Sequence, residues 1–289
     1  MARSRSAIIV LLLTLVAGNL LYAGFDRARD PLAGVPGDLL YVAAFDGYLD
    51  EWDLYDGQQS ATIEDGRLRL ALSSARTASW SVARHHFVEF DVSVAARAVA
   101  GPIDNAFGIV FAMQSPSEEA CDLPAVVFCG IGQWSALLNA ALRKVLDPAA
   151  GRNYYAFLIS SDGYYALERI VDGAREVLST WIPSRDIHHD LGAHNRIRVI
   201  AHGSELEFFV NGVHVMLCIP DEPGASSTFT NGECIGGRMV DGFQAPEPLR
   251  GQLGLIAQAT QTGGGGVVVD FDNVTVFSPS VAGGGDAKL

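Results

Sequence analysis

Apolar and polar residues alternate in short segments along most of the chain. Three segments alternate with a period of two residues, namely 67–72, 88–94 and 205–210. Two others, 105–113 and 267–271, are apolar at nearly every position. Alternation is typical of a strand with one solvated face, and a short continuous apolar run is typical of a strand covered on both faces. The pattern therefore predicts β-sheets that pack against each other.

Turn-forming dipeptides separate these segments. Asp-Gly and Asn-Gly pairs tolerate the positive backbone φ angles that tight hairpin turns need. Four of them stand between segments of strand character: Asp65-Gly66, Asp162-Gly163, Asp172-Gly173 and Asn211-Gly212. We predict an all-β fold, a two-sheet antiparallel β-sandwich that spans residues 41–277 as one domain, because single sandwiches of roughly 200–250 residues are common.

The longest apolar run lies at the start of the chain. Residues 7–25 carry no charge and follow Arg3 and Arg5. A membrane-spanning helix needs roughly 17–25 residues, whereas the core of a cleaved signal peptide is usually ~7–15 residues long. The 19 residues of this run therefore favour an uncleaved signal anchor, a transmembrane helix within residues 1–25 that contacts the lipid bilayer through 7–25. Cleavage near Gly24 and a buried core helix are the alternatives.

The flanking charges indicate the orientation of this anchor. Arg3 and Arg5 precede the run, whereas the two arginines after it are interleaved with Asp26 and Asp30. Positive residues favour the cytoplasmic side of a membrane. We therefore expect a single-pass protein of the cell membrane whose C-terminal domain is extracytoplasmic.

The remaining chain divides by composition. Residues 26–40 are a predicted linker, because they mix charges with prolines and glycines. Apolar residues spaced as on one face of a helix predict a short helix at 134–146, within an insertion at 115–150. A second insertion is expected at 218–250. The tail 278–289 has almost no apolar content, so we expect it to be disordered.

All four cysteines follow the predicted anchor: Cys121, Cys129, Cys218 and Cys234. An even number of cysteines outside the cytoplasm favours disulfides, and their spacing matches no standard zinc pattern. We expect one disulfide within each insertion, Cys121 with Cys129 and Cys218 with Cys234. Reduced cysteines, or pairing between the two insertions, are the alternatives.

Acidic residues dominate the charge of the chain. Asp and Glu number 33 against 20 Lys and Arg, which gives a net charge of −13. Because the predicted anchor holds two arginines and no acid, the rest of the chain carries −15. Nucleic-acid binding requires clustered basic side chains that neutralise phosphates. The composition therefore argues against nucleic acid as a partner.

The order of several motifs resembles a known superfamily. The motifs are Phe45-Asp46 followed by Trp52, the turn Asp65-Gly66-x-Leu68, the segment 153–163, Trp181, Asn195-x-Ile197, Phe209-Val-Asn-Gly212, 251–255 and 271–275. They resemble the concanavalin A-like lectin/glucanase sandwiches, in particular the laminin-G-like and 3-keto-disaccharide hydrolase (domain of unknown function 1080) type of bacterial ectodomain. The resemblance covers about residues 41–277 outside the insertions. It implies a jelly-roll sandwich, and since the motifs are turns and core aromatics, it implies little about activity.

The superfamily also suggests a test for catalysis. Retaining β-glucanases have sites that look like Glu-x-Asp-x-x-Glu along one strand, with nucleophile and general acid about 5–5.5 Å apart. Glu89-Phe-Asp91 matches the first half of this pattern, but Val94 stands at the second Glu position. The chain thus lacks the required acid/base. We interpret Glu89 and Asp91 as the solvated face of a strand and expect no catalytic residues.

Two groups of side chains are of metal-binding type. The first lies within one short segment: Asp186, His188, His189, Asp190 and His194. It lacks the helical histidine spacing of zinc sites, so we interpret it as an exposed loop. The second group, Asp46, Asp270 and Asp272, lies near the ends of the first and last predicted strands. A structural calcium ion is the alternative there to ordinary strand-end caps, and no other cofactor is expected.

The predicted meander at 153–181 contains the candidate ligand-binding residues. Two-residue turns at 162–163 and 172–173 would set its register and place four residues on one face: Tyr155, Tyr164, Glu168 and Trp181. The other face would carry a row of leucines: Leu158, Leu167 and Leu178. If the leucines form the core, the first face is an aromatic and acidic surface of the kind that stacks on sugar rings. Burial of the aromatic residues, with the leucines under an insertion, is the alternative.

These observations favour a membrane-anchored extracytoplasmic recognition module. It would bind carbohydrate or a protein partner without catalysis, since no paired carboxylates or nucleophile–base pair can be placed. A glycoside hydrolase-like enzyme and a structural envelope protein are the alternatives.

Overall fold

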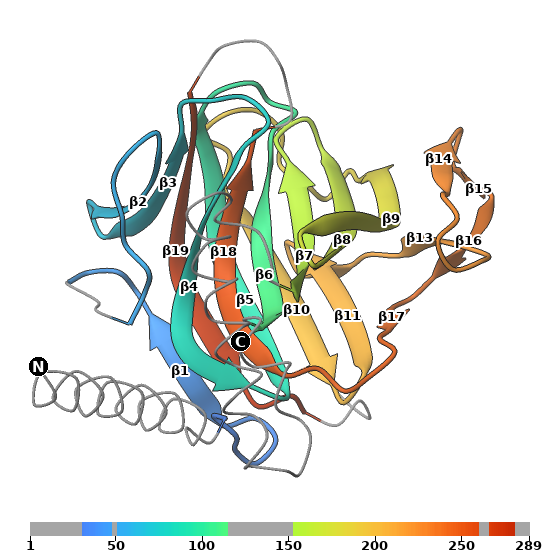
Figure 1. Cartoon of the computed structure of the whole chain (residues 1–289), viewed down its shortest axis with the longest axis horizontal. Coiled ribbons are helices and arrows are strands. Elements are labelled where there is room, and N and C mark those ends of the chain that lie inside the picture. The colour runs from blue at the N-terminus through green and yellow to red at the C-terminus, as the bar shows by residue number, and fades with distance from the viewer. Residues whose placement is uncertain (1–30, 48–50, 115–152, 260–265, 281–289) are drawn as a thin grey trace, which may run out of the picture. The chain divides into compact units, whose positions relative to one another are not determined.

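The computed structural model describes residues 31–47, 51–114, 153–259 and 266–280, and in these residues the protein is all-β. Two large antiparallel sheets make up a sandwich within the compact unit 32–114 and 152–289 (Figure 1). No helix among the described residues is long and apolar enough to cross a membrane. Several predictions lie outside the described residues: the anchor at 1–25, the helix at 134–146, Cys121 with Cys129, and the end of the tail.

The larger sheet has nine strands in the order β12-β11-β10-β5-β19-β3-β2, with β1 added on β19 and β17 on β11. Its strands are β1 (Leu39–Ala43), β2 (Gln59–Glu64), β3 (Arg67–Leu72), β5 (Phe90–Ala100), β10 (Asn195–His202), β11 (Glu205–Val210), β12 (Val213–His214), β17 (Phe243–Gln244) and β19 (Val267–Phe277). The last strand of the chain thus lies at the centre of this sheet, beside β5 and β3.

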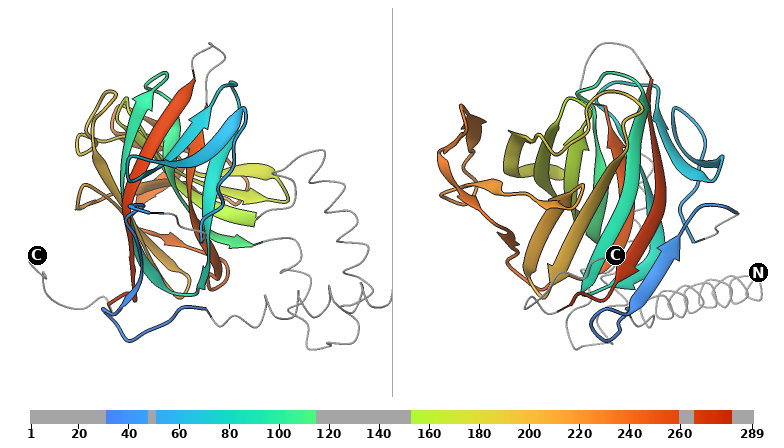
Figure 2. Two further views of the ribbon diagram at one scale, coloured as in Figure 1. Left: turned by 90° about the vertical axis from the view of Figure 1, so that its left-hand side faces the viewer. Right: turned by 180° about the vertical axis from the view of Figure 1, so that it is seen from behind.

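The smaller sheet has six strands in the order β4-β18-β6-β7-β8-β9. Its strands are β4 (Ala78–Phe87), β18 (Gly251–Gln258), β6 (Ala106–Gln114), β7 (Asn153–Ser160), β8 (Tyr164–Val171) and β9 (Ala174–Pro183). Figure 2 shows the two sheets packed face to face.

A disulfide-bonded pair of hairpins follows β12. It consists of β13 (Leu217–Pro220) paired with β16 (Gly237–Val240), and β14 (Thr228–Thr230) paired with β15 (Glu233–Ile235). Cys218 and Cys234 form a disulfide across a sequence separation of 16 residues. The predicted pairing of these two cysteines is confirmed.

Buried phenylalanines fill the space between the sheets. Eight are essentially inaccessible to solvent: Phe45, Phe87, Phe90, Phe107, Phe111, Phe157, Phe208 and Phe271. The rings of Phe157 and Phe208, from opposite sheets, lie 4.8 Å apart between centroids. The predicted alternation holds in β3, whose three leucines are buried. The two-sheet sandwich is confirmed.

The sandwich begins earlier and ends later than the sequence pattern indicates. Leu32 pairs with Phe87, and β1 starts at Leu39, so part of the predicted linker belongs to the fold. At the other end, Ser278 is 7% exposed and its backbone N–H donates to Asp38 at 2.8 Å. The sequence pattern does not reveal these contacts, because prolines and glycines interrupt the hydrophobic periodicity without preventing backbone pairing.

Candidate functional site

The six-stranded sheet buries apolar side chains on both of its faces. One face contributes to the core between the sheets. The other carries a second cluster: Val82, Ala106, Val110, Met113, Tyr154, Ala156, Leu158, Ile170 and Ile256, with Ala78, Trp80 and Trp181 packed against it. Because side chains alternate along a strand, Tyr164 and Glu168 share this outer side with Ile170, and Arg175 is directly opposite Ile170. We define the outer aromatic face by six residues: Trp80, Tyr154, Tyr164, Glu168, Arg175 and Trp181.

Rows of paired residues cross this face. One row consists of Trp80, Ile256, Gly108, Leu158 and Ala166. The next consists of Val82, Gly254, Val110, Ala156, Glu168 and Val177. A Cβ atom on Gly108 would lie 2.0 Å from the carbonyl oxygen of Phe157, so only glycine fits there. In these rows the middle strands present glycine, alanine and aliphatic residues together with Glu168, whereas Trp80 and Trp181 stand on the two edge strands.

Glu168 is the buried carboxylate of the outer aromatic face. Its side chain is 0% exposed, and the strands beside it present Ala156 and Val177. Oε1 accepts a hydrogen bond from Arg175 Nη2, while Oε2 has no hydrogen-bond partner. The hydrogen bond to Glu168 raises the pKa of Arg175, which keeps the guanidinium charged. A buried acceptor without a donor costs about 1–3 kcal/mol or more, so Oε2 makes the position of Glu168 energetically costly.

The structure brings together three of the four predicted ligand-binding residues. Tyr164, Glu168 and Trp181 lie on the outer aromatic face. Tyr155 lies on the opposite side of the sheet, where it stacks on Phe111 with 5.6 Å between ring centroids. The prediction that Tyr155 shares this surface is therefore wrong. A binding role for the other three residues stays a prediction.

A one-residue shift in the hairpin between β7 and β8 explains the error. Residues 161–163 form a three-residue loop, so Tyr155 pairs with Arg169. The Ser160 hydroxyl donates to Asp162, and the Gly163 N–H donates to the Ser160 carbonyl at 3.1 Å, which closes the loop. A shift of one residue moves every side chain of a strand to the other face.

The next hairpin has the predicted turn. Asp172 and Gly173 have φ angles of 51° and 79°, and Val171 lies opposite Ala174. The predicted leucine row is nevertheless divided between the faces. Two leucines, Leu167 and Leu178, lie in the core between the sheets, whereas Leu158 lies in the outer cluster.

Three residues of the outer aromatic face were not among the predicted ones: Trp80, Tyr154 and Arg175. The turn at 172–173 already places Arg175 opposite Ile170, so the register could have revealed it. Trp80 is hidden by its neighbours, since the serines on both sides of it look solvated but are 0% exposed. Their hydroxyls donate to backbone carbonyls, which satisfies them inside the sandwich.

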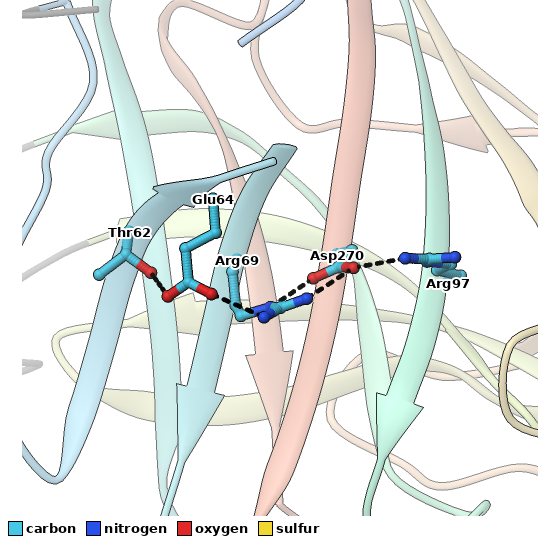
Figure 3. Close-up of polar contacts among 5 residues, drawn as sticks. All are labelled: Thr62, Glu64, Arg69, Arg97 and Asp270. Atoms are coloured by element: carbon cyan, nitrogen blue, oxygen red, sulfur yellow. Dashed lines mark hydrogen bonds and ion pairs between the residues drawn. The ribbon is translucent and has the colours of Figure 1, made fainter. Parts of the chain in front are cut away.

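The outer side of the nine-stranded sheet is different, because it carries a row of ion pairs. Figure 3 shows Asp270 on β19 between Arg69 on β3 and Arg97 on β5. Asp270 accepts from Arg69 Nε at 2.7 Å and from Arg97 Nη2 at 2.9 Å. Glu64 extends the row by accepting from Arg69 Nη1 at 2.7 Å, and Thr62 donates to Glu64. Each carboxylate in this row is bound within the sheet.

The pKa of Asp270 reflects its two arginine partners. Burial acts to raise its pKa, but the hydrogen bonds from Arg69 and Arg97 outweigh burial and hold the pKa below the ordinary value of 3.8. Both oxygens of Asp270 are therefore engaged by guanidinium groups. A calcium ion at Asp46, Asp270 and Asp272 stays a prediction, and within the described ranges no three His, Cys, Asp or Glu residues gather closely enough to hold a metal ion.

The acidic residues of the partial glucanase pattern have structural partners. Asp91 accepts two hydrogen bonds from Arg198, both at 2.6 Å. Glu89 accepts from the backbone N–H of Gly203 at 3.2 Å. Val94, at the position where the pattern needs its second acid, is 0% exposed in the core. These contacts lie on the nine-stranded sheet, away from the outer aromatic face.

The histidine-rich segment is a loop held by hydrogen bonds. Nδ1 of His188 lies 2.7 Å from the carbonyl oxygen of His194. The side-chain amide of Asn195 accepts a hydrogen bond from the His188 N–H and donates one to the His188 carbonyl oxygen. The ring of His189 lies against Gly163 of the β7–β8 loop. The segment therefore braces the loop that sets the register of the outer aromatic face.

A hollow of about 620 Å³ lies beside β11 and β17. Three carboxylates line it: Glu205, Glu207 and Asp241. Two aromatic rings also line it. Phe209 is contacted by the Arg198 guanidinium at 5.1 Å and by His214 at 5.0 Å, and Phe243 lies 6.2 Å from the ring of Tyr155. This hollow offers largely solvated acids and no free aromatic surface, so the outer aromatic face is the stronger candidate.

Comparison with known proteins shows the fold. No protein-family model and no curated protein matches the sequence. A protein of unknown function with a galectin-like fold from Bacillus subtilis matches with a TM-score of 0.51 at 12% identity, over 84% of this chain and 97% of its own. A structure described as a native glycosidic hydrolase matches with a TM-score of 0.50 at 11% identity, over 86% of this chain and 100% of its own. At these identities the likeness shows the fold alone, a galectin-like sandwich. The concanavalin A-like resemblance, and its laminin-G-like or 3-keto-disaccharide hydrolase type, stay predictions.

Proposed function

We propose that this protein is a non-catalytic glycan-binding domain that is tethered outside the cytoplasm by residues 7–25. The observation that carries the proposal is the outer aromatic face. Half-buried Trp80 and Trp181 and exposed Tyr164 lie on the same side of the sheet as Glu168, a carboxylate with one acceptor oxygen that has no donor. Sugar rings present C–H groups that stack on aromatic rings, and their hydroxyls donate to carboxylates.

The charge of the face also favours a sugar over a strongly charged ligand. Glu168 and Arg175 neutralise each other, and the remaining side chains of the defined face are aromatic. Orientation of a neutral ligand requires a small number of placed polar groups on a largely apolar surface. The Arg175 guanidinium, whose side chain is 52% exposed, supplies donors beside the buried carboxylate of Glu168.

The number of carboxylates separates this proposal from a glycosidase. Both retaining and inverting glycosidases use two carboxyl groups, roughly 5–9.5 Å apart. Among the described strand residues on this side of the six-stranded sheet, Glu168 is the one carboxylate, since Glu176 on β9 pairs with Arg169 on the opposite side. Its Oε1 is committed to Arg175, and the described strand residues of this side offer no second acid for proton transfer.

A glycan array tests the proposal directly. The full chain, purified in detergent, is screened for binding, and the affinity for the best oligosaccharide is then measured by calorimetry. We expect Trp181→Ala and Trp80→Ala each to weaken binding about tenfold, which corresponds to roughly 1.4 kcal/mol. Glu168→Gln tests the acceptor oxygen at nearly constant volume.

Phe277→Ala is the matched control for Tyr164→Ala. Both aromatic side chains are partly exposed, at 37% and 38%, but Phe277 lies on the nine-stranded sheet. We expect only Tyr164→Ala to weaken binding. Binding that survives all the changes on the outer aromatic face would remove it as the site, and release of new reducing ends from the bound oligosaccharide would favour the glycosidase alternative.

A further inference from the structure

Exposed apolar side chains gather at one corner of the nine-stranded sheet. We define this apolar corner by Val35, Leu39, Val42 and Phe277, which are 68%, 56%, 55% and 37% exposed. Leu39 lies opposite Phe277 and Val42 lies opposite Thr275 in the β1–β19 pairing. Directly opposed residues share a face of a sheet, so these side chains point to the same outer side. Single exposed apolar residues are ordinary, but a contiguous group of them is typical of a surface that contacts a protein, a ligand or a membrane.

Hydrogen bonds hold the turn that presents Val35. The Val35 N–H donates to Asp38 Oδ2 at 3.0 Å, and the Gly37 N–H donates to the Ser278 carbonyl at 2.9 Å. The Ser278 hydroxyl in turn donates to the Gly34 carbonyl at 3.0 Å. Ser278 directly follows Phe277, so the turn is fastened to the strand that carries the other exposed ring. The exposure of Val35 therefore belongs to an ordered turn.

The sequence before this turn limits the distance between the apolar corner and a membrane. Nine residues, 26–34, connect the uncharged run 7–25 to Val35. A fully extended stretch of that length spans at most roughly 30 Å. If residues 7–25 enter a bilayer, the apolar corner cannot move farther than this from the membrane surface. The linking residues carry two acids and two arginines, so their charges balance.

We propose that the apolar corner rests on the lipid bilayer and orients the sandwich at the membrane. Apolar side chains at a domain surface enter the boundary between headgroups and acyl chains, and binding grows with the apolar area that they bury. The proposal rests on the predicted anchor and is independent of glycan binding. With the corner against lipid, the sandwich is held in one orientation instead of swinging on a free linker.

The opposite end of the same sheet provides a control. Val99 and Leu191 are 38% and 43% exposed, and Gly192 donates its N–H to Ala98 on β5. Ala98 is seven residues along β5 from Asp91, the partner of Phe277, a separation of roughly 23 Å. Leu191 is thus similarly apolar and exposed, but lies far from the corner.

Photo-crosslinking in vesicles tests the proposal. The full chain is reconstituted into phosphatidylcholine and phosphatidylglycerol vesicles with a photoreactive benzoylphenylalanine at one position: Leu39→benzoylphenylalanine, Val42→benzoylphenylalanine or, as control, Leu191→benzoylphenylalanine. After irradiation, mass spectrometry measures the fraction of chain that carries a lipid adduct. We expect at least a fivefold higher fraction at Leu39 and Val42 than at Leu191.

Three results would overturn the proposal. Equal lipid yields at the corner and at Leu191 would show that the corner has no preferred contact with lipid. Crosslinks between two chains in place of lipid adducts would assign the corner to a second copy of the protein. Release of the chain from the vesicles by alkaline carbonate would refute the anchor and this proposal together, while leaving the proposed binding of glycans by the outer aromatic face untouched.

Discussion

The outer sides of the two sheets differ in how their carboxylates are satisfied. On the nine-stranded sheet, Asp270 receives hydrogen bonds from two arginines, and Asp91 receives two from Arg198. On the six-stranded sheet, Glu168 is bound through one oxygen only. Both arrangements lie on the same sandwich, so the difference is not a consequence of the fold. The carboxylates of the ion-pair row are bound, although Arg97 Nε beside them has no partner, whereas Glu168 on the other sheet keeps an acceptor oxygen without a donor.

The surroundings of Asp270 and Glu168 explain why this difference affects the stability of the fold. The side chain of Asp270 is 1% exposed, but its two arginines are each 26% exposed and reach water. Glu168 is buried among apolar strands with a single guanidinium beside it. A buried charge that is fully hydrogen-bonded can be retained for stability, whereas a partly satisfied one costs stability unless a ligand completes it.

The largest expected effect is at Asp270. Asp270→Ala removes the carboxylate that binds Arg97 and leaves Arg69 paired with Glu64 alone. We expect the free energy of unfolding to fall by about 3 kcal/mol, near the lower end of the range for broken buried pairs because the arginines are partly hydrated. Urea denaturation followed by tryptophan fluorescence measures it. A loss of less than about 1 kcal/mol would mean that the row in Figure 3 is not stabilising.

The second expected effect concerns the pair of Arg175 and Glu168. Arg175→Met removes the one donor to Glu168, so the buried carboxylate loses its counter-charge. We expect a loss of about 2 kcal/mol, and Arg175→Met combined with Glu168→Leu should recover most of it because no unpaired charge remains. The same denaturation experiment measures both variants. If the double variant were less stable than Arg175→Met alone, Glu168 would contribute more through packing than through its charge.

The third effect is a dependence on pH. The pKa of Asp270 is lowered in the folded state, so its stabilising contribution is fully present above the unfolded value of about 3.8. That contribution is lost as the pH falls through the lower folded pKa. We expect the stability difference between the natural chain and Asp270→Asn to shrink as the pH is lowered from about 5 to about 2. A difference that stays constant over this range would exclude the ion pairs as its cause.

The smallest effect is expected at the exposed end of the same row. The side chain of Glu64 is 48% exposed, and exposed ion pairs contribute about 0–1 kcal/mol. We expect Glu64→Gln to lower the free energy of unfolding by no more than about 0.5 kcal/mol. This variant is also the control for Asp270→Ala, since both remove an acid bound to Arg69. Losses of similar size in the two variants would show that burial does not set the strength of the row.

Local sequence determined much of this protein. The alternation in β3 and β11 predicted those strands, and the Asp172-Gly173 pair predicted both the turn type and its register. The spacing and location of Cys218 and Cys234 predicted their disulfide. These features depend on residues close together in the chain, where backbone preferences and short loops decide the outcome.

The face that a strand presents was decided only by tertiary structure. Strand β7 is buried on both sides, so its sequence contains no alternation to show which side chains face the core. Its register depends on the three-residue loop at 161–163, and a two-residue turn at nearly the same place would have reversed the face of Tyr155.

The ion pairs likewise depended on the assembled sheet. Asp270 is separated from Arg69 by 201 residues and from Arg97 by 173 residues, and nothing in the local sequence links them. Pairing of β19 with β3 and β5 brings their charges together, and it takes Asp270 out of the predicted set of strand-end acids. Sequence therefore determined the strands and turns, whose energetics are local, while the assembly of the sheets decided which carboxylates are satisfied and which one keeps a free oxygen.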